Sequence, residues 1–335
     1  MKSATIYDVA DLAGVSHQTV SRFLSGYEGI RPGTREKVER ALTELNYRPN
    51  SAARLLRARR TNRIGYLADR IDQSGPSRTL VGASQAARDL GYVLDVVPID
   101  GGDEASITVA LDIITQDQVA GIVISAQTRE ARAALDRRAL PIPIARDFDL
   151  YVGATTEKVN ESAGRIAAEH LLDLGHRRVA YVAGPSSWTA SIDRASAFSD
   201  AIHAGGGTVV ATDEGDWSAR SGHAAGVRLA RQAAEFTAVA TANDAMAIGL
   251  LAAFAAAELR VPGDVSVIGT DDTPDAEFMS PPLTTVAMHF GFEGRFVVTS
   301  LVAQLEGRPP EGMPLLPTPE VVARASTAAP RTPVG

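Results

Sequence analysis

Apolar residues recur at spacings of three and four over the first 46 residues, as they do on the buried face of a helix. The pattern predicts a first helix that Thr5 caps and Gly14 ends, a second that begins after Ser16, and a third with Thr34 as its N-cap. The expected buried positions are Ile6, Val9, Ala10 and Ala13, then Val20, Phe23 and Leu24, then Val38, Ala41, Leu42 and Leu45.

The pattern changes after residue 62. Short apolar runs with strand character, such as RIGYLAD and VSVIGTDD, alternate with helical runs. This alternation predicts parallel sheets with helices on both faces. We therefore expect an all-α headpiece followed by an α/β core of two doubly wound parallel-sheet subdomains. The expected boundaries are 1–46 for the headpiece, 47–61 for an arginine-rich linker, 62–158 with 289–317 and 159–288 with 318–328 for the subdomains, and 329–335 for a tail.

The first two helices fit the register of a helix-turn-helix motif of about 20 residues that starts at Ile6. Its fifth position must be small, because the helices touch there, and Ala10 occupies it. Its ninth must adopt a positive φ, and it is Gly14. Val20 falls on the fifteenth position, which is buried. The alternative is a chance helical hairpin in which Gly14 is only a C-cap.

In a helix-turn-helix the second helix enters the major groove, where its first side chains meet base edges. A glutamine pairs with adenine and an arginine with guanine through two hydrogen bonds. For each of these polar side chains the alternative is an ordinary solvated helix face. The candidate base-reading residues are His17, Gln18, Ser21 and Arg22, and the candidate phosphate contacts are Tyr7, Ser16, Thr19 and Thr34.

Charge supports the nucleic-acid interpretation. The net charge of the chain is −7, yet residues 1–62 hold eleven Lys and Arg against six Asp and Glu, so this part carries +5 and the rest −12. The chain has no cysteine, which excludes disulfides and thiolate chemistry. It shows no apolar run of about 18 residues and no signal peptide at its start, so we expect a cytoplasmic protein without membrane contact.

Two other classes are disfavoured. An enzyme is not expected, because the sequence has no Walker loop, no G-x-S-x-G and no H-E-x-x-H motif, and we expect neither a metal nor a cofactor. A transport-type binding protein would suit the core, but the basic helical headpiece and the missing signal peptide argue against it.

Several segments together resemble the lactose/galactose repressor family of bacterial transcription regulators: TIYDVADLAGVSHQTVSRFLSG, TREKVERALTELNYRPN, EGDWSARSG, TANDAMAIG, IGTDDTPD and PPLTT. The resemblance covers nearly the whole chain. It implies that NSAARLLR is a hinge helix ordered on operator DNA, in which Asn50 contacts DNA and Leu56 enters the minor groove. Leu55 takes that place if the register slips by one, and the alternative role of Leu56 is helix packing.

The resemblance also implies a core like that of periplasmic sugar-binding proteins, with an effector between the two subdomains. Carboxylate, amide and guanidinium groups suit a polyol because each makes two aligned hydrogen bonds to adjacent hydroxyls. An aromatic face covers the apolar side of the sugar ring. The implied effector-binding residues are Asp69, Ser125, Asp147, Arg194, Trp217, Asn243, Asp271, Met288 and Phe290.

Some of these residues have structural alternatives. The alternative for Trp217 is an ordinary core or surface tryptophan, and the alternative for Asp271 is a carboxylate that caps the turn after a strand. Asn243 is suited to cap the following helix, a role compatible with ligand contact.

Other positions depart from the family pattern. Met288, Ser125 and Asp69 stand where the resemblance leads us to expect a glutamine, an asparagine and a small hydroxyl residue. The alignment around PIPIARDFD is uncertain by one residue, so Asp149 is the alternative to Asp147. These departures leave the identity of the sugar open.

The combined expectation is a DNA-binding repressor whose affinity for a pseudo-palindromic operator is controlled by a small sugar. The resemblance favours a galactoside- or glucoside-type inducer, although relatives also use a ligand as co-repressor, so the sign of control stays open. The chain ends in TAAPRTPVG without a leucine-heptad helix, so we expect a homodimer.

Overall fold

The computed structural model describes residues 5–24, 27, 29–45, 61–116, 118–137, 140, 142–148, 150–307 and 315–331. The chain forms two compact units, Met1–Thr61 and Asn62–Gly335, and each is described by itself. The predicted hinge, with Asn50, Leu55 and Leu56, lies outside the described residues, and so does Asp149.

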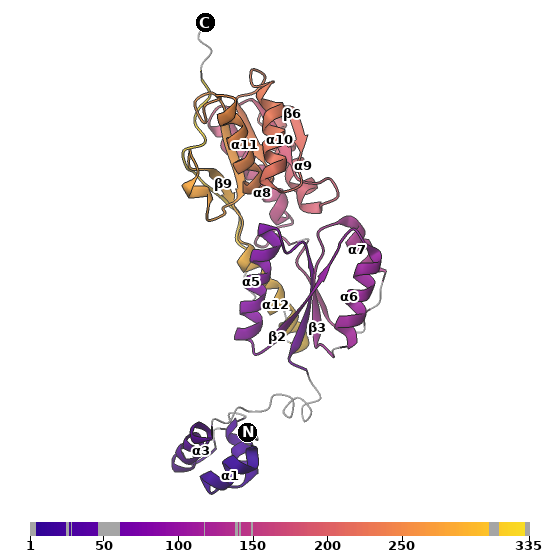
Figure 1. Cartoon of the computed structure of the whole chain (residues 1–335), viewed down its shortest axis with the longest axis vertical. Helices are drawn as coiled ribbons and strands as arrows, with labels where there is room; N and C mark the ends of the chain where they lie inside the picture. The colour runs from indigo at the N-terminus through magenta and orange to yellow at the C-terminus, as the bar shows by residue number, and fades with distance from the viewer. Residues whose placement is uncertain are drawn as a thin grey trace. The chain divides into compact units, whose positions relative to one another are not determined.

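The described part of the first unit holds the three helices that the sequence predicts (Figure 1): α1 (Ile6–Ala13), α2 (His17–Leu24) and α3 (Pro32–Glu44). The Thr5 side chain caps α1, and Gly14 ends it with a φ of 64°. The backbone N–H of Val15 donates to the Ala10 carbonyl at 3.0 Å, which closes the turn between the helices. Val9, Val20 and Val38 are fully buried and form the centre of the unit.

One detail of the prediction is wrong. Helix α3 begins at Pro32 with Arg31 as its N-cap, so Thr34 lies inside the first turn and does not cap it. Proline favours the first helical position because its φ is already helical and its missing N–H would have no partner there. This preference moves the start of the helix two residues ahead of the threonine.

In the second unit, the first lobe is built on a sheet whose order among the described residues is β2-β1-β3-β4, with every neighbouring pair parallel. Figure 1 shows α5 and α12 on one face of this sheet and α6 and α7 on the other. The elements are β1 (Arg63–Asp69), α5 (Ser74–Asp89), β2 (Val93–Ile99), α6 (Glu104–Gln116), β3 (Gly121–Ser125), α7 (Arg129–Asp136), β4 (Ile144–Arg146) and α12 (Phe290–Leu305).

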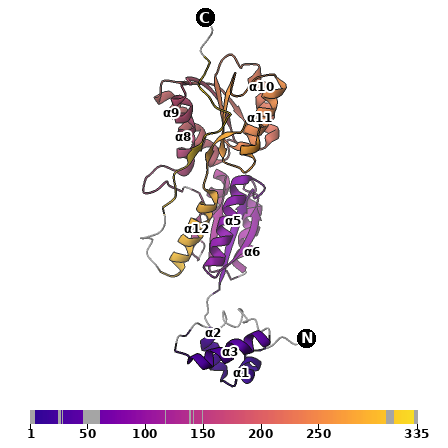
Figure 2. The same ribbon diagram turned by 90° about the vertical axis from the view of Figure 1, so that its left-hand side faces the viewer.

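The second lobe has the sheet order β10-β9-β8-β7-β5-β6 among its described residues. Helices α8 and α9 cover one face, and α10 and α11 cover the other (Figure 2). The elements are α8 (Val159–Asp173), β5 (Arg178–Ala183), α9 (Thr189–Ala204), β6 (Thr208–Glu214), α10 (Ala219–Ala230), β7 (Ala238–Thr241), α11 (Asp244–Ala256), β8 (Ser266–Asp271), the 3-10 turn η1 (Ala276–Phe278), β9 (Thr284–Ala287) and β10 (Glu320–Val322).

The chain crosses between the lobes near its end. After β9 it leaves the second lobe and forms α12, which packs on α5 of the first. It then returns as β10, the only antiparallel strand among those described, which pairs with β9 at the sheet edge. Both lobes therefore depend on segments that are far apart in the sequence.

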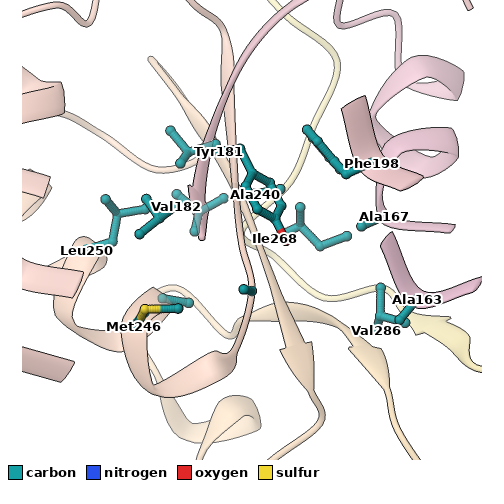
Figure 3. Close-up of a cluster of buried hydrophobic side chains, with 14 of the residues drawn as sticks. Ala163, Ala167, Tyr181, Val182, Phe198, Ala240, Met246, Leu250, Ile268 and Val286 are labelled. Atoms are coloured by element: carbon teal, nitrogen blue, oxygen red, sulfur yellow. The ribbon is translucent and has the colours of Figure 1, made fainter. Parts of the chain in front are cut away.

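The core of the second lobe is formed by side chains from both faces of its sheet. Figure 3 shows Tyr181 beside Phe198 of α9, with Leu250 and Met246 of α11 on the opposite face of the strands. The rings of Tyr181 and Phe198 have centroids 4.8 Å apart, and Phe198 is fully buried. This packing holds the strand ends in fixed positions.

The helix pairs contact each other through glycines. A Cβ atom at Gly82, Gly164, Gly222, Gly249 or Gly294 would lie between 1.8 and 2.1 Å from a carbonyl oxygen of the partner helix. Such distances are impossible for any larger residue without moving the backbone. The pairs α5–α12, α8–α9 and α10–α11 are therefore interlocked at backbone contact.

Within the ranges that the structure describes, no helix has the length and apolar character needed to cross a membrane.

Candidate functional site

The candidate DNA-reading side chains lie on α2. Gln18 and Arg22 are exposed and one turn apart, so they project from the same face of the helix. The Arg22 guanidinium lies 5.7 Å from the centre of the Tyr27 ring, and the His17 ring lies 5.2 Å from that of Tyr7. The aromatic rings thus border the exposed face that carries the two candidate base readers.

Ser16 begins α2 as a cap. Its Oγ accepts the backbone N–H of Thr19 at 3.2 Å and lies 2.9 Å from the Thr19 hydroxyl. A helix N-terminus attracts phosphate because its first N–H groups have no partner in the helix. Ser21 is half-buried and adjoins the exposed Arg22. The DNA contacts of all these residues remain predictions.

The second unit contains a cavity of about 80 Å³ that is partly open to solvent. Both lobes line it, with α5 and the ends of β3 and β4 on one side and α8, α9 and the ends of β7 and β8 on the other. Six of the nine predicted effector residues line it: Asp147, Arg194, Trp217, Asn243, Asp271 and Phe290.

The other three do not line the cavity. The Asp69 carboxylate is buried and accepts the backbone N–H groups of Gly101 and Gln127, each at 3.3 Å, so it fastens two loops. The Ser125 hydroxyl is buried and accepts a hydrogen bond from the Gln127 side chain. Met288 is a member of the hydrophobic core of the second lobe. Direct ligand contact by these three residues is therefore not supported.

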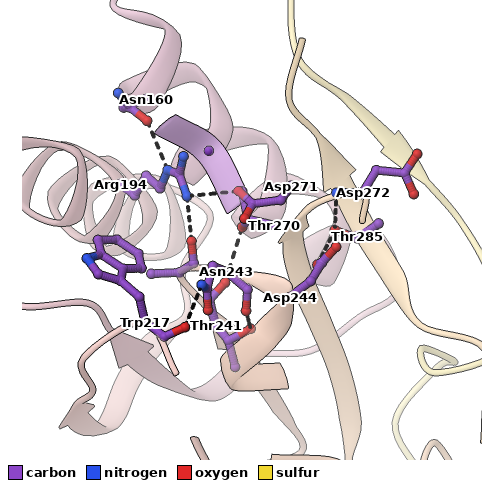
Figure 4. Close-up of polar contacts among 12 residues, drawn as sticks. Asn160, Arg194, Trp217, Thr241, Asn243, Asp244, Thr270, Asp271, Asp272 and Thr285 are labelled. Carbon is purple, nitrogen blue, oxygen red and sulfur yellow. Dashed lines mark hydrogen bonds and ion pairs between the residues drawn. The ribbon is translucent and has the colours of Figure 1, made fainter. Parts of the chain in front are cut away.

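Arg194 is the centre of the polar network on the α9 side (Figure 4). Its Nε donates to Asn160 Oδ1 at 3.0 Å and its Nη1 donates to the Ala242 carbonyl at 2.6 Å. The same Nη1 lies 3.4 Å from Asp271 Oδ1, in an ion pair whose side chains are 6% and 5% exposed. These contacts fix the orientation of the Arg194 guanidinium and the Asp271 carboxylate.

Gly164 sets the position of Arg194, because the Arg194 carbonyl occupies the space where a Cβ at residue 164 would be. We expect Gly164→Ala to push α9 away from α8, to cost about 1–3 kcal/mol of stability and to lower Tm by several degrees. Calorimetry measures this. Gly291→Ala, where a Cβ meets nothing within 4 Å, is the control and should leave Tm unchanged. Equal behaviour of the two variants would contradict the proposed helix contact.

Asn243 and Trp217 are held by one another. Asn243 Nδ2 donates to the Trp217 carbonyl at 3.0 Å, and its Oδ1 accepts the N–H of Met246 at 2.9 Å, so Asn243 also caps α11. The backbone of Trp217 has a φ of 71°, and that of Asp271 a φ of 123°. Side chains rarely adopt such conformations except where the surrounding structure imposes them, often at functional sites.

Two tryptophans form the aromatic wall of the cavity. The rings of Trp188 and Trp217 have centroids 5.4 Å apart. Trp188 is placed by an antiparallel bridge to Thr128 of the other lobe, and Thr189 N–H donates to the Gln127 carbonyl at 3.1 Å. Arg78 of α5 likewise donates to the carbonyl of Asp271 at 2.7 Å. The lobes are thus joined on both sides of the cavity.

Three carboxyl groups face this cavity, and burial raises the pKa of each. The pKa of Asp147 is raised to about 6, although hydrogen bonds from Ser125 and Tyr66 oppose the shift. The pKa of Asp271 is raised by burial against the opposing charges of Arg194 and Arg78. The pKa of Glu293 is raised to about 7. The unliganded cavity therefore disfavours full ionisation of its acids.

The Glu293 shift predicts a pH-dependent gain in stability for Glu293→Gln. A raised folded-state pKa means that the native carboxyl holds its proton more tightly, so stability falls as pH rises from about 4.5 to about 7. The variant should match the wild type at about pH 4 and exceed it by about 1–3 kcal/mol at about pH 8. Denaturant unfolding at both pH values measures this.

Glu235 is exposed, and Glu235→Gln serves as the control that should show no such difference. A Glu293→Gln variant whose advantage is the same at both pH values would show that the burial of this carboxyl does not cause the effect.

The sequence interpretation missed other residues that line the cavity, among them Gln127, Asn160, Trp188 and Glu293. Trp188, in the segment VAGPSSW, is 6% exposed and lines the cavity. Its place, directly after a strand and a proline-containing loop, is the sequence signal that could have predicted its position at the cavity. No local signal distinguished Asn160 or Glu293, since both lie in ordinary helical sequence.

Comparisons with known proteins agree with this architecture. Residues 5–50 match the family model of bacterial regulatory proteins of the lacI family, and residues 168–327 match a periplasmic binding protein-like domain. A helix-turn-helix unit joined to a two-lobed ligand-binding core defines a class of transcription regulators that respond to a ligand.

Sequence relatives extend over the whole chain. The lactose operon repressor of Escherichia coli (strain K12) is 33% identical over 336 residues, which cover 99% of this chain and 93% of that protein. The regulator CelR of Thermobifida fusca is 31% identical over 337 residues, which cover 96% and 98%. The chain therefore belongs to the lacI family of bacterial regulatory proteins. It is a DNA-binding transcriptional repressor with a ligand-binding core, and its relatives are repressors rather than enzymes.

Solved structures show the same fold. The lac repressor dimer bound to operator and the anti-inducer ONPF has a TM-score of 0.81 at 32% identity, and the match covers 98% of this chain and 100% of that chain. The CelR–cellobiose complex has a TM-score of 0.67 at 27% identity, with 96% and 99% covered.

Proposed function

We propose that the repressor is a cytoplasmic homodimer that binds a pseudo-palindromic operator and releases it when a galactoside- or glucoside-type sugar occupies the cavity. The cavity carries this proposal, because its Arg194–Asp271 pair, its Asn160 amide and its Trp188–Trp217 wall combine the groups that bind a sugar ring. Polar groups aimed at adjacent hydroxyls and an aromatic face for the C–H side are the usual components of such sites.

Solved structures of relatives also support a sugar ligand. CelR, which shares the fold, is known as a complex with cellobiose, and lac repressor structures hold ONPF or ONPG. These similarities support a glycoside. The three residues that depart from the family pattern, Asp69, Ser125 and Met288, do not line the cavity.

Control by the ligand would run through both lobes. Arg78 and Trp188 already connect them at the edges of the cavity. A sugar that contacts Asp147 on one side and Arg194 on the other favours one relative position of the lobes. Coupling between effector and operator of about 1–3 kcal/mol is typical of such switches.

A thermal-shift screen of mono- and disaccharides, followed by operator release with the sugars that bind, tests the proposal. When the effective sugar is added, the fluorescence anisotropy of a labelled operator should fall because the repressor releases it. The apparent affinity for the operator should decrease by about 5- to 150-fold. A sugar that binds and tightens operator binding would reverse the proposed sign. Failure of every neutral sugar and glycoside to bind would reject the neutral effector class.

A further inference from the structure

We propose that the effector carries a protonated amine on its sugar ring, and that Glu293, together with Asp147, is the residue pair that selects it. This inference rests on the proposed function and assigns the chemical class of the ligand in the same cavity. It starts from the charges that surround the cavity and a smaller recess beside it, which share Asp147, Asn160, Ala190 and Glu293.

Seven charged residues line these two spaces: Arg132, Asp147, Lys158, Asp193, Arg194, Asp271 and Glu293. Each base stands opposite an acid. Arg194 pairs with Asp271 at 3.4 Å, and Lys158 pairs with Asp193 at 3.3 Å. Arg132 lies in the recess with Asp147 and offsets its charge. Among the described residues of both walls, Glu293 is the acid without a close ion pair, because Arg194 and Arg78 act on it only from a longer distance.

Two carboxylate oxygens of these acids also lack hydrogen-bond partners among the described residues. They are Oε1 of Glu293 and Oδ1 of Asp147, and both are buried. The other oxygen of Asp147 accepts the Tyr66 hydroxyl at 3.1 Å, which directs the carboxylate. Two acceptors that share one wall and repel each other are suited to a group that donates several hydrogen bonds and carries positive charge. An ammonium group has both properties.

A third unpartnered atom lies in the same cavity and is independent of the acids. Trp217 is 6% exposed, yet its Nε1 has no partner among the described residues. Burying an N–H without a partner is costly, so this donor also indicates a ligand, here one with an acceptor oxygen. A hydroxylated ring with one amine satisfies all three atoms.

Alternative ligands fit less well. A sugar phosphate or a sugar acid would add negative charge beside Glu293 and Asp147, and Arg78, the nearby base without an ion pair among the described residues, already donates to the Asp271 carbonyl. A neutral sugar satisfies the hydrogen bonds but leaves the pKa of Glu293 raised, so the ionised carboxylate stays disfavoured. The amine removes this disadvantage.

The test compares matched ligands by calorimetry on the full-length protein at about pH 7. The 2-amino sugars of the gluco, galacto and manno series are each paired with the parent sugar and with the N-acetyl form, which has no charge. We expect one amino sugar to bind at least about tenfold more tightly than both of its partners. Glu293→Gln should reduce this preference to less than about threefold.

Glu235→Gln, an exposed acid of the second lobe, is the matched control and should retain the wild-type preference. The inference is overturned if parent sugars bind as tightly as amino sugars, or if Glu293→Gln keeps the full amine preference. If parent sugars bind as tightly as amino sugars and release the operator, the proposed function still holds although the inference fails. An amino sugar that binds without releasing operator supports the inference and contradicts the proposed function, and absence of binding by both classes rejects both.

Discussion

Replacement of Asp271 by asparagine is expected to leave operator binding intact and to weaken effector binding by at least about 100-fold. Asp271 ends β8 at the cavity, and its carboxylate is paired with Arg194 in a setting where both side chains are at most 6% exposed. The change keeps the size of the side chain but removes the charge that orients the guanidinium. Calorimetry with the effective sugar and anisotropy with operator DNA measure the two affinities separately.

Asparagine is preferred to alanine in this experiment, because alanine would leave a buried guanidinium without its partner and would destabilise the lobe. Asp264→Asn is the control: Asp264 pairs with Arg260 at 2.7 Å on the surface of the same lobe. That variant should keep both affinities within about twofold. If Asp271→Asn responded to the sugar as the wild type does, the assignment of Asp271 to the effector site would be wrong.

The second large effect is expected on DNA. Arg22→Ala should lower affinity for the operator by about 10- to 100-fold while leaving binding to unrelated DNA nearly unchanged. Arg22 is exposed on α2, one turn after Gln18, where a guanidinium reaches the two acceptors of guanine. Losing such a contact removes discrimination at one base pair in each half of the operator.

Lys37→Ala gives the contrasting result. Lys37 is exposed on α3, outside the predicted recognition helix, so we expect it to contact phosphate if it contacts DNA. Loss of that contact would weaken binding to operator and unrelated DNA equally and reduce the salt dependence. Titrations at several salt concentrations separate the two patterns. Equal losses on both DNAs for Arg22→Ala would assign this arginine to the phosphates instead of the bases.

The headpiece helices could be predicted because their signals are local. Thr5 and Gly14 act within one turn of the residues that they cap, so the sequence alone defines α1 and the turn after it. At α3 two local signals compete, and the proline at position 32 prevails over the threonine at 34. Strand β4 was not predicted, since it has three residues and follows directly after Pro143.

The cavity was only partly predictable. The family resemblance implied Asp271 and Asn243, and both line the cavity at or directly after strand ends, where ligands meet parallel sheets. Asp69 also ends a strand, but its carboxylate accepts hydrogen bonds from two backbone N–H groups instead of facing the cavity. These N–H groups belong to loops more than 30 residues away in the sequence. Glu293 reaches the cavity only because the chain crosses between the lobes before α12, which no local pattern reports.

The interlocked glycines have a consequence for how this core evolves. On α12 the side chains that face the cavity, Phe290 and Glu293, lie in the first turn, whereas Gly294 next to them fixes the helix against α5. Phe290 also packs against Gly75 and Arg78 of α5, so it contributes to the scaffold as well as to the cavity. We expect substitutions at Glu293 to change the ligand that the repressor senses, while the backbone contacts of Gly82 and Gly294 keep the helix pair in place.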